Sequence, residues 1–269
     1  MRRFFLGALC LATLALAQPG TCQTKLEPGV SCQGFTVQLA DFESRAELMY
    51  PSNASQPLPT VLLVHAGYPS DLDGTFSEGG KLISRNLLTI AEYLSKQGFA
   101  TARYNKRYVK NADDVDSSRY ERLGIPDFVS DAKTMLKTLL ENPHVNPKRL
   151  FIMGWSEGAL VSTRAALEFP SLRGVILMSP PVIIEGKDYG LLTPAKQIKQ
   201  PVLTLQGSSD QITEVKFTPQ LEQAFSQNPD FTIRYYPGLR HGLGQDSEFS
   251  TIDPAPLHDL ELWLKQHSQ

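Results

Sequence analysis

The sequence predicts an α/β fold, with a doubly wound, mostly parallel β-sheet that begins with antiparallel strands. Short apolar runs such as 60–65 and 149–153 are typical of strands buried on both faces of a parallel sheet. Longer segments with helical periodicity alternate with these runs along the chain. The chain has 269 residues and no linker rich in Pro, Gly and Ser in its middle, so it fits one large domain.

The elements are expected in the following order. Segments 33–39 and 45–50 alternate between apolar and polar residues, which predicts an opening hairpin with its turn at 41–44. Continuous apolar or β-branched runs then predict strands at 60–65, 99–104, 149–153, 174–178, 201–206 and 232–236. Amphipathic spacing predicts helices between them at 81–97, 127–141, 159–167, 214–227 and 257–266.

Two segments interrupt the alternation of strand and helix. Residues 68–80 are rich in Gly, Ser and Asp, and 180–200 contain two adjacent prolines and two glycines. Long connections on such scaffolds usually shape a ligand pocket. We therefore expect 180–199 to form a short lid or cap, the alternative being a plain surface loop.

The N-terminus has the pattern of a secretory signal. Arg2 and Arg3 precede the apolar run 4–16, and Ala15 and Ala17 form a small-residue cleavage pattern. The run is too short to span a membrane. We expect a signal peptide at 1–17, a mature domain at 18–269, and a secreted or periplasmic location. The alternative is an apolar N-terminal helix that is not cleaved.

The cysteines agree with export, and the net charge bears on possible partners. Cys22 and Cys32 would remain after cleavage and would enter an oxidising compartment, so we predict one disulfide between them. The formal net charge of the whole chain is −2, and no basic patch suggests nucleic acid as a partner.

A serine motif lies between a predicted strand and a predicted helix. The sequence GWSEG at 154–158 follows the apolar run and precedes the helical segment. This is the setting of a nucleophile elbow, in which strained backbone angles lift the serine hydroxyl clear of the sheet. The glycines at both ends of the motif would let the two backbones pass closely. Ser156 is therefore the candidate nucleophile.

A serine nucleophile needs a histidine as general base and an acid that orients the histidine. His241 follows the last predicted strand in a loop, where its ring could fold over the carboxyl edge of the sheet. Asp210 follows the strand before it, which gives the chain order Ser, acid, His. Asp188 and Asp230 are competing acids, although Asp230 would lie at the wrong end of its strand. The other histidines are expected on the surface or in a loop: His65, His144, His258 and His267.

The oxyanion of a tetrahedral intermediate needs two N–H donors. The N–H of Glu157 is one candidate, because it begins the helix after the elbow. The second should come from the loop after the first central strand, where we assign Gly67, with Ala66 or Tyr68 as alternatives. His65 is then expected to organise this loop.

Three passages carry a resemblance to a known family: HAGYPSDLDG at 65–74, RYNKR at 103–107 and GWSEGA at 154–159. They resemble the motifs HGSGPxDRDG, RYDKRG and GHSEGG of the α/β-hydrolase superfamily, within its bacterial esterase and serine-aminopeptidase-like branch. This branch is related to prolyl oligopeptidase catalytic domains and dienelactone hydrolases. The resemblance runs from about residue 60 to 241 and implies an α/β-hydrolase fold. Trp155 stands where the branch has His, so we expect Trp155 and Tyr68 to line the substrate pocket.

No cofactor or metal is expected. Asp71 and Asp73 lie in a Gly-rich loop without the further oxygen ligands of a calcium loop, which favours a hydrogen-bonded turn. Phosphate-binding and dinucleotide motifs do not follow the first central strand.

The sequence thus predicts an exported serine hydrolase that cleaves small-molecule carboxylic esters. An aminopeptidase or other amide hydrolase is the alternative enzyme, and a substrate amine would then need a carboxylate such as Glu157, Glu185 or Asp188. A secreted binding protein on a hydrolase scaffold is the alternative from another class. The oligomeric state is left open.

Overall fold

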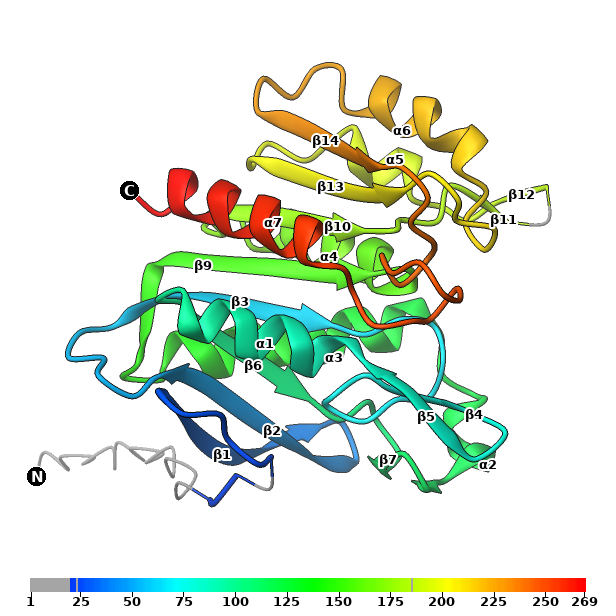
Figure 1. Ribbon diagram of the computed structural model, residues 1–269. Coiled ribbons are helices and arrows are strands. Elements are labelled where there is room, and N and C mark those ends of the chain that lie inside the picture. The colour runs from blue at the N-terminus through cyan, green and yellow to red at the C-terminus, as the bar shows by residue number, and fades with distance from the viewer. Residues whose placement is uncertain (1–19, 23, 185) are drawn as a thin grey trace, which may run out of the picture.

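The central feature of the fold is a twisted sheet with helices on both faces (Figure 1). The computed structural model describes residues 20–22, 24–184 and 186–269. The predicted signal peptide at 1–17 lies outside them. Within them, the largest sheet has eight strands in the order β1-β2-β6-β3-β9-β10-β13-β14. Their bounds are β1 Val30–Leu39, β2 Phe42–Pro51, β3 Leu58–Val64, β6 Ala100–Tyr104, β9 Val145–Trp155, β10 Gly174–Met178, β13 Val202–Gly207 and β14 Phe231–Tyr236.

The strand directions confirm the expected mostly parallel sheet with an antiparallel start. Strand β2 is antiparallel to both β1 and β6, whereas β6, β3, β9, β10, β13 and β14 run parallel. Chain segments that follow the parallel strands therefore meet at one edge of the sheet. This carboxyl edge is the usual place for ligand sites in such folds.

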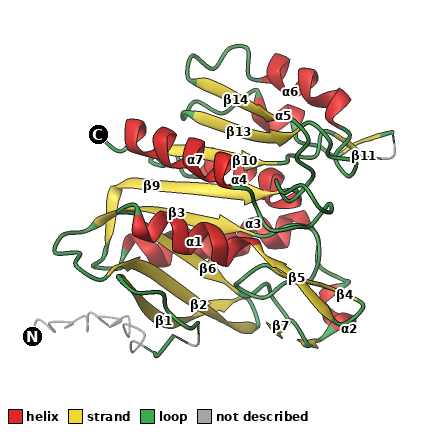
Figure 2. Ribbon diagram, viewed as in Figure 1, coloured by secondary structure: helices red, strands yellow, loops and turns green. Residues whose placement is uncertain are grey.

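Helices cover both faces of the sheet and enclose two apolar cores (Figures 1 and 2). Helices α1 (Asn86–Lys96) and α7 (Pro254–His267) pack on one face. Helices α3 (Ile125–Leu140), α4 (Glu157–Glu168) and α6 (Thr218–Ala224) pack on the other. The central strands are buried on both faces, which explains why their sequences are continuously apolar.

The structure corrects three predicted boundaries. The opening hairpin turns at Ala40 and Asp41, and β2 already begins at Phe42. Residues Lys81–Arg85 form strand β5, paired with β4 (Thr75–Glu78), so the helix predicted from 81 begins only at Asn86. Adjacent glycines at 79 and 80, both with positive φ, provide the tight turn that favours a hairpin here. The helix predicted at 214–227 is shorter: α6 follows a 3₁₀ turn at Val215–Phe217.

Small elements follow β6 and β10, two strands that end at the carboxyl edge of the sheet (Figure 2). After β6 come β7 (Val109–Asn111), β8 (Asp114–Val115) and α2 (Ser117–Tyr120). The segment predicted as a lid contains the short hairpin of β11 (Ile183–Ile184) and β12 (Lys187–Asp188), and then α5 (Leu192–Ala195). None of these elements was predicted, because each has only two to four residues.

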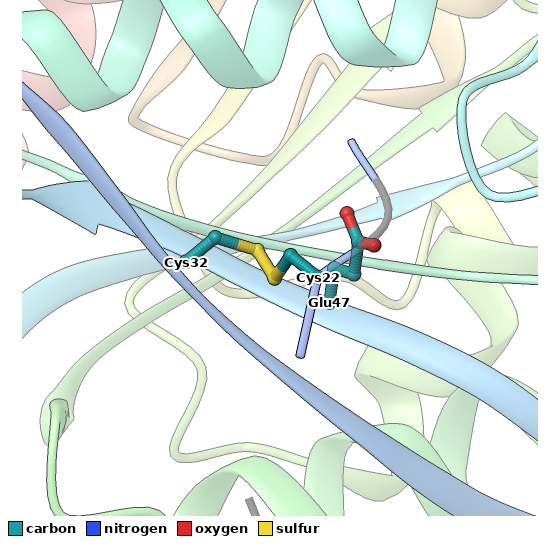
Figure 3. Close-up of side chains that lie close together, drawn as sticks. All are labelled: Cys22, Cys32 and Glu47. Carbon is teal, nitrogen blue, oxygen red and sulfur yellow. A yellow bond between two sulfur atoms is a disulfide. The ribbon is translucent and has the colours of Figure 1, made fainter. Parts of the chain in front are cut away.

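The predicted disulfide is present and lies beside a buried carboxylate (Figure 3). Cys22 and Cys32 are bonded to each other, and Glu47 lies close to both sulfurs. The hydroxyl of Thr24 donates a hydrogen bond to Glu47 at 2.7 Å. The bridge therefore ties Cys22 to β1, and the Thr24 hydrogen bond holds the following residues against β2. The carboxylate of Glu47 also pairs with the buried Arg103 at 3.0 Å.

In the described part of the chain, no helix combines the length and the apolar character needed to cross a membrane.

We expect replacement of both bridging cysteines by serine to lower the free energy of unfolding by about 2–3 kcal/mol. The disulfide closes a loop over a sequence separation of 10, and its loss returns that loop-closure entropy to the unfolded chain. Urea denaturation of the double variant and of the oxidised wild type measures the difference. Equal transition midpoints would contradict this account.

Candidate active site

Ser156 occupies a strained turn between β9 and α4. Its backbone has φ 55° and ψ −121°, which costs of order 1–3 kcal/mol for a residue with a side chain. A Cβ atom on Gly154 would lie 1.9 Å from the carbonyl oxygen of Gly158. One on Gly158 would lie 2.5 Å from that of His65. The motif thus needs glycine at both ends, as expected of an elbow.

Asp210 and His241 are hydrogen-bonded to each other, at 3.0 Å between Oδ2 and Nδ1, and both are buried. Asp210 also accepts from the N–H and hydroxyl of Thr213, the N–H of Ile212 and the side-chain amide of Gln206. Burial alone would raise the pKa of Asp210, but the bonds from His241 and Thr213 outweigh it and lower the pKa to about 2. The carboxylate is therefore ionised at neutral pH and can hold the imidazole in one orientation.

The loop of His241 is attached to the ends of the central strands. The indole N–H of Trp155 and the hydroxyl of Ser179 both donate to the carbonyl of His241, at 3.2 and 2.7 Å. The N–H of Ser156 donates to the carbonyl of Met178, the residue before Ser179, at 2.8 Å. The serine turn and the histidine loop therefore meet at the carboxyl ends of β9 and β10.

Two further contacts join the Asp210 loop to the His241 loop. A Cβ atom on Gly207 would lie 2.4 and 2.5 Å from the carbonyl oxygens of Leu239 and Arg240, so only glycine lets the loops approach this closely. Glu248 accepts from the N–H of His241 at 3.2 Å. The roles of Gly207 and Glu248 were not predicted, because their partners are set by tertiary structure.

The two competing acids lie elsewhere. Asp230 precedes β14 at the amino edge of the sheet and lies 3.2 Å from the ring of His267. His267 is buried and stacks on Trp263, which corrects the expectation that it is a surface residue. Asp188 accepts the N–H of Gly190 in the turn after β12. Only Asp210, of the acids considered, contacts His241.

The two candidate oxyanion donors lie side by side. Gly67 follows β3 and is exposed, and a Cβ atom there would lie 3.5 Å from side-chain atoms of Glu157. Within the described residues, the N–H groups of Gly67 and Glu157 have no hydrogen-bond acceptor, so both are free to donate to a bound group. Ala66, one of the alternatives, is buried.

The Glu157 side chain forms an ion pair with a buried lysine and is itself partly buried. Its carboxylate lies 3.4 Å from the ammonium of Lys106 and accepts from the hydroxyl of Tyr189 at 3.2 Å. The Lys106 side chain is only 4% exposed. Lys106 belongs to the RYNKR passage, but its role was not predicted, because its contacts involve segments about 40 and 50 residues away.

The loop after β3 is held from inside the fold. The buried ring of His65 lies edge-on to Tyr104, and burial together with the nearby Lys106 lowers its pKa to about 3. Asp71 accepts from the N–H of Asp73 and from the N–H and hydroxyl of Thr75, which confirms the expected hydrogen-bonded turn.

Aromatic rings gather on the histidine side of the candidate site. Phe249 lies edge-on to His241 at 5.6 Å between ring centroids and stacks on Phe76 at 4.2 Å. Tyr68 contacts both phenylalanines and Trp155 at its edge. Trp155, which is expected to line a pocket, is only 1% exposed and instead holds the His241 loop through its indole N–H. Tyr68, Phe76 and Phe249 are only partly buried.

The fold is that of the α/β-hydrolase class of proteins. Within this class, residues 46–256 match the dienelactone hydrolase family. The match covers most of the chain, and the protein belongs to that family.

Relatives and solved structures agree with the family. The chain is 32% identical to esterase EstD of Thermotoga maritima over 127 residues, 47% of this chain and 28% of the relative. It is 24% identical to the mouse acylamino-acid-releasing enzyme over 86% of this chain and 35% of the relative. It thus spans about a third of the length of these curated relatives. A dienelactone hydrolase structure from Anabaena variabilis has the same fold, with a TM-score of 0.66, 17% identity, and coverage of 90% of this chain and all of that one.

The lowered pKa of Asp210 predicts a pH-dependent stability. An aspartate in the unfolded chain has a pKa of about 3.9. The ionised carboxylate of Asp210 therefore stabilises the folded state by roughly 2 kcal/mol above that pH, and this contribution is lost as the pH falls toward about 2. The Asp210→Asn variant lacks this pH-dependent contribution to the free energy of unfolding. The difference in unfolding free energy between wild type and variant should therefore shrink by about half from pH 6 to pH 3. A difference that stays constant in urea titrations at the two pH values would contradict the assignment.

Proposed function

We propose that the protein is an exported serine hydrolase that cleaves carboxylic esters through an acyl-enzyme intermediate. The observation that carries the proposal is the buried Asp210–His241 hydrogen bond, attached to the same strand ends as the strained turn of Ser156. Membership of a hydrolase family supports it. The predicted signal peptide and the disulfide support export.

In the proposed reaction, the Ser156 hydroxyl attacks the ester carbonyl carbon, and Nε2 of His241 takes its proton. The N–H groups of Gly67 and Glu157 donate to the resulting oxyanion. Collapse of the tetrahedral intermediate breaks the bond to the alcohol oxygen, which receives the proton from His241. Water then attacks the acyl-enzyme, with His241 as base, and releases the acid and free Ser156. Asp210 stays ionised throughout and stabilises the imidazolium.

The surroundings of the site favour an ester over a substrate with a free amine. An aminopeptidase would need a carboxylate for the substrate ammonium, but Glu157 is already paired with Lys106 and Asp188 is engaged in a turn. Glu185 lies outside the described residues. The partly exposed rings of Phe76 and Phe249 offer an apolar surface instead. We propose that Tyr68 and the segment 180–199 complete this pocket.

Replacing Ser156 with alanine should abolish ester hydrolysis and leave the fold intact. Loss of the nucleophile removes most of the rate enhancement of a serine hydrolase. Hydrolysis of p-nitrophenyl butyrate measures the activity, and circular dichroism checks the fold. Ser162→Ala, in the buried part of α4, is the matched control that should keep its activity. An active Ser156→Ala enzyme would refute the proposal.

Three substrates separate the ester and amine alternatives. Alanine p-nitroanilide should be hydrolysed no faster than N-acetylalanine p-nitroanilide, and both should be much slower than p-nitrophenyl butyrate. A dedicated carboxylate would favour the free amine by about 10- to 100-fold in kcat/KM, the contribution of one charge-assisted hydrogen bond. Such a preference, measured at equal substrate concentrations, would show that the enzyme is an aminopeptidase.

A further inference from the structure

A single buried lysine contacts both parts of the proposed oxyanion site. Lys106 follows β6 at the carboxyl edge of the sheet. Its ammonium donates to the carbonyl of Ala66 at 2.6 Å and to that of Tyr68 at 3.3 Å. On the other side it lies 3.4 Å from the carboxylate of Glu157. The two carbonyls flank Gly67, so the lysine binds the backbone on both sides of one proposed donor and the side chain of the other.

The lysine is itself held in place. The hydroxyl of Tyr120 lies 3.0 Å from Nζ, and the ring of Phe128 packs against the ammonium at 4.4 Å from its centroid. Burial lowers the pKa of Lys106, and the charge and hydrogen bond of Glu157 oppose that effect. These contacts hold the ammonium of Lys106 in one position, whereas the side chain of a surface lysine is long and flexible.

Peptide geometry relates this ammonium to the oxyanion. The carbonyl of Ala66 and the N–H of Gly67 belong to one planar trans peptide, so they point in opposite directions. A cation that binds the carbonyl from inside the fold therefore turns the N–H outward, to the exposed side of Gly67. The same cation polarises the peptide and makes its N–H a stronger donor. The bond to the Tyr68 carbonyl holds the 68–69 peptide as well, so the ammonium restrains the loop on both sides of Gly67.

We propose that Lys106 is a positioning residue of the oxyanion site, whose ammonium fixes the 66–67 peptide so that the Gly67 N–H faces the developing oxyanion. This inference rests on the serine hydrolase function proposed above. Lys106 itself does not touch the substrate. A purely structural role, in which the lysine only neutralises Glu157, makes different predictions for the variants below.

Lys106→Met removes the ammonium and keeps the length of the side chain. We expect kcat for p-nitrophenyl butyrate to fall about 30- to 1000-fold, the range for a misplaced or lost oxyanion donor, while KM changes less than about threefold. The affinity for a boronic acid that forms a tetrahedral adduct should fall in parallel with kcat. Lys110→Met, at a lysine whose side chain is 71% exposed, is the matched control and should behave as the wild type.

A double variant separates positioning from charge balance. Lys106→Met leaves the Glu157 carboxylate without its cation, so it is expected to lower the melting temperature as well. Lys106→Met with Glu157→Gln removes both charges. It should regain most of the melting temperature but not kcat or the affinity for the boronic acid. This variant also keeps the test decisive if the single variant does not fold.

Two results would overturn the inference. One is a Lys106→Met enzyme with kcat and boronic acid affinity within about threefold of the wild type. The other is recovery of kcat together with stability in the double variant. Either result would leave the proposed function standing as long as the wild type hydrolyses the ester and Ser156→Ala does not. An inactive wild type would instead refute the function itself.

Discussion

The hydrogen bond between His241 and Asp210 is the interaction on which the rest of the site depends. It joins two loops that follow different strands, and both loops are fixed by further contacts. Gly207 permits the close passage of one loop over the other, and the carbonyl of His241 is held by Trp155 and Ser179. The ring is thus held by Asp210 and its backbone by Trp155 and Ser179, which spares the entropy of ordering them during a reaction.

Buried charges determine the shape of the loop after β3. The ammonium of Lys106 holds its first residues, and Arg103, which is fully buried between Glu47 and Asp73, holds its middle. Ion pairs taken out of water contribute little net stability, but breaking one of them is costly. Here these ion pairs restrict the loop after β3 to a single conformation. The disulfide and Thr24 add to this network at Glu47, far from Ser156 in the sequence.

Local sequence patterns predicted the features of the fold that depend on neighbouring residues alone. The central strands were found because they are continuously apolar, and the Ser156 turn because glycine is needed on both sides of it. The pairing of Asp210 with His241 followed from their places after consecutive strands. By contrast, the sequence of β5 predicts the start of a helix, because five residues carry too little periodicity to identify a strand. Lys106 and Phe249 were missed because their roles depend on partners distant along the chain.

We propose that His241, oriented by Asp210, activates Ser156, and labelling with a fluorophosphonate tests this activation. The reagent reacts with a serine only when a base withdraws its proton. We expect one adduct, located on Ser156 by mass spectrometry, and a labelling rate that falls about 100-fold or more in His241→Gln. An adduct on a different residue, no adduct in the wild type, or an unchanged rate in His241→Gln would contradict it.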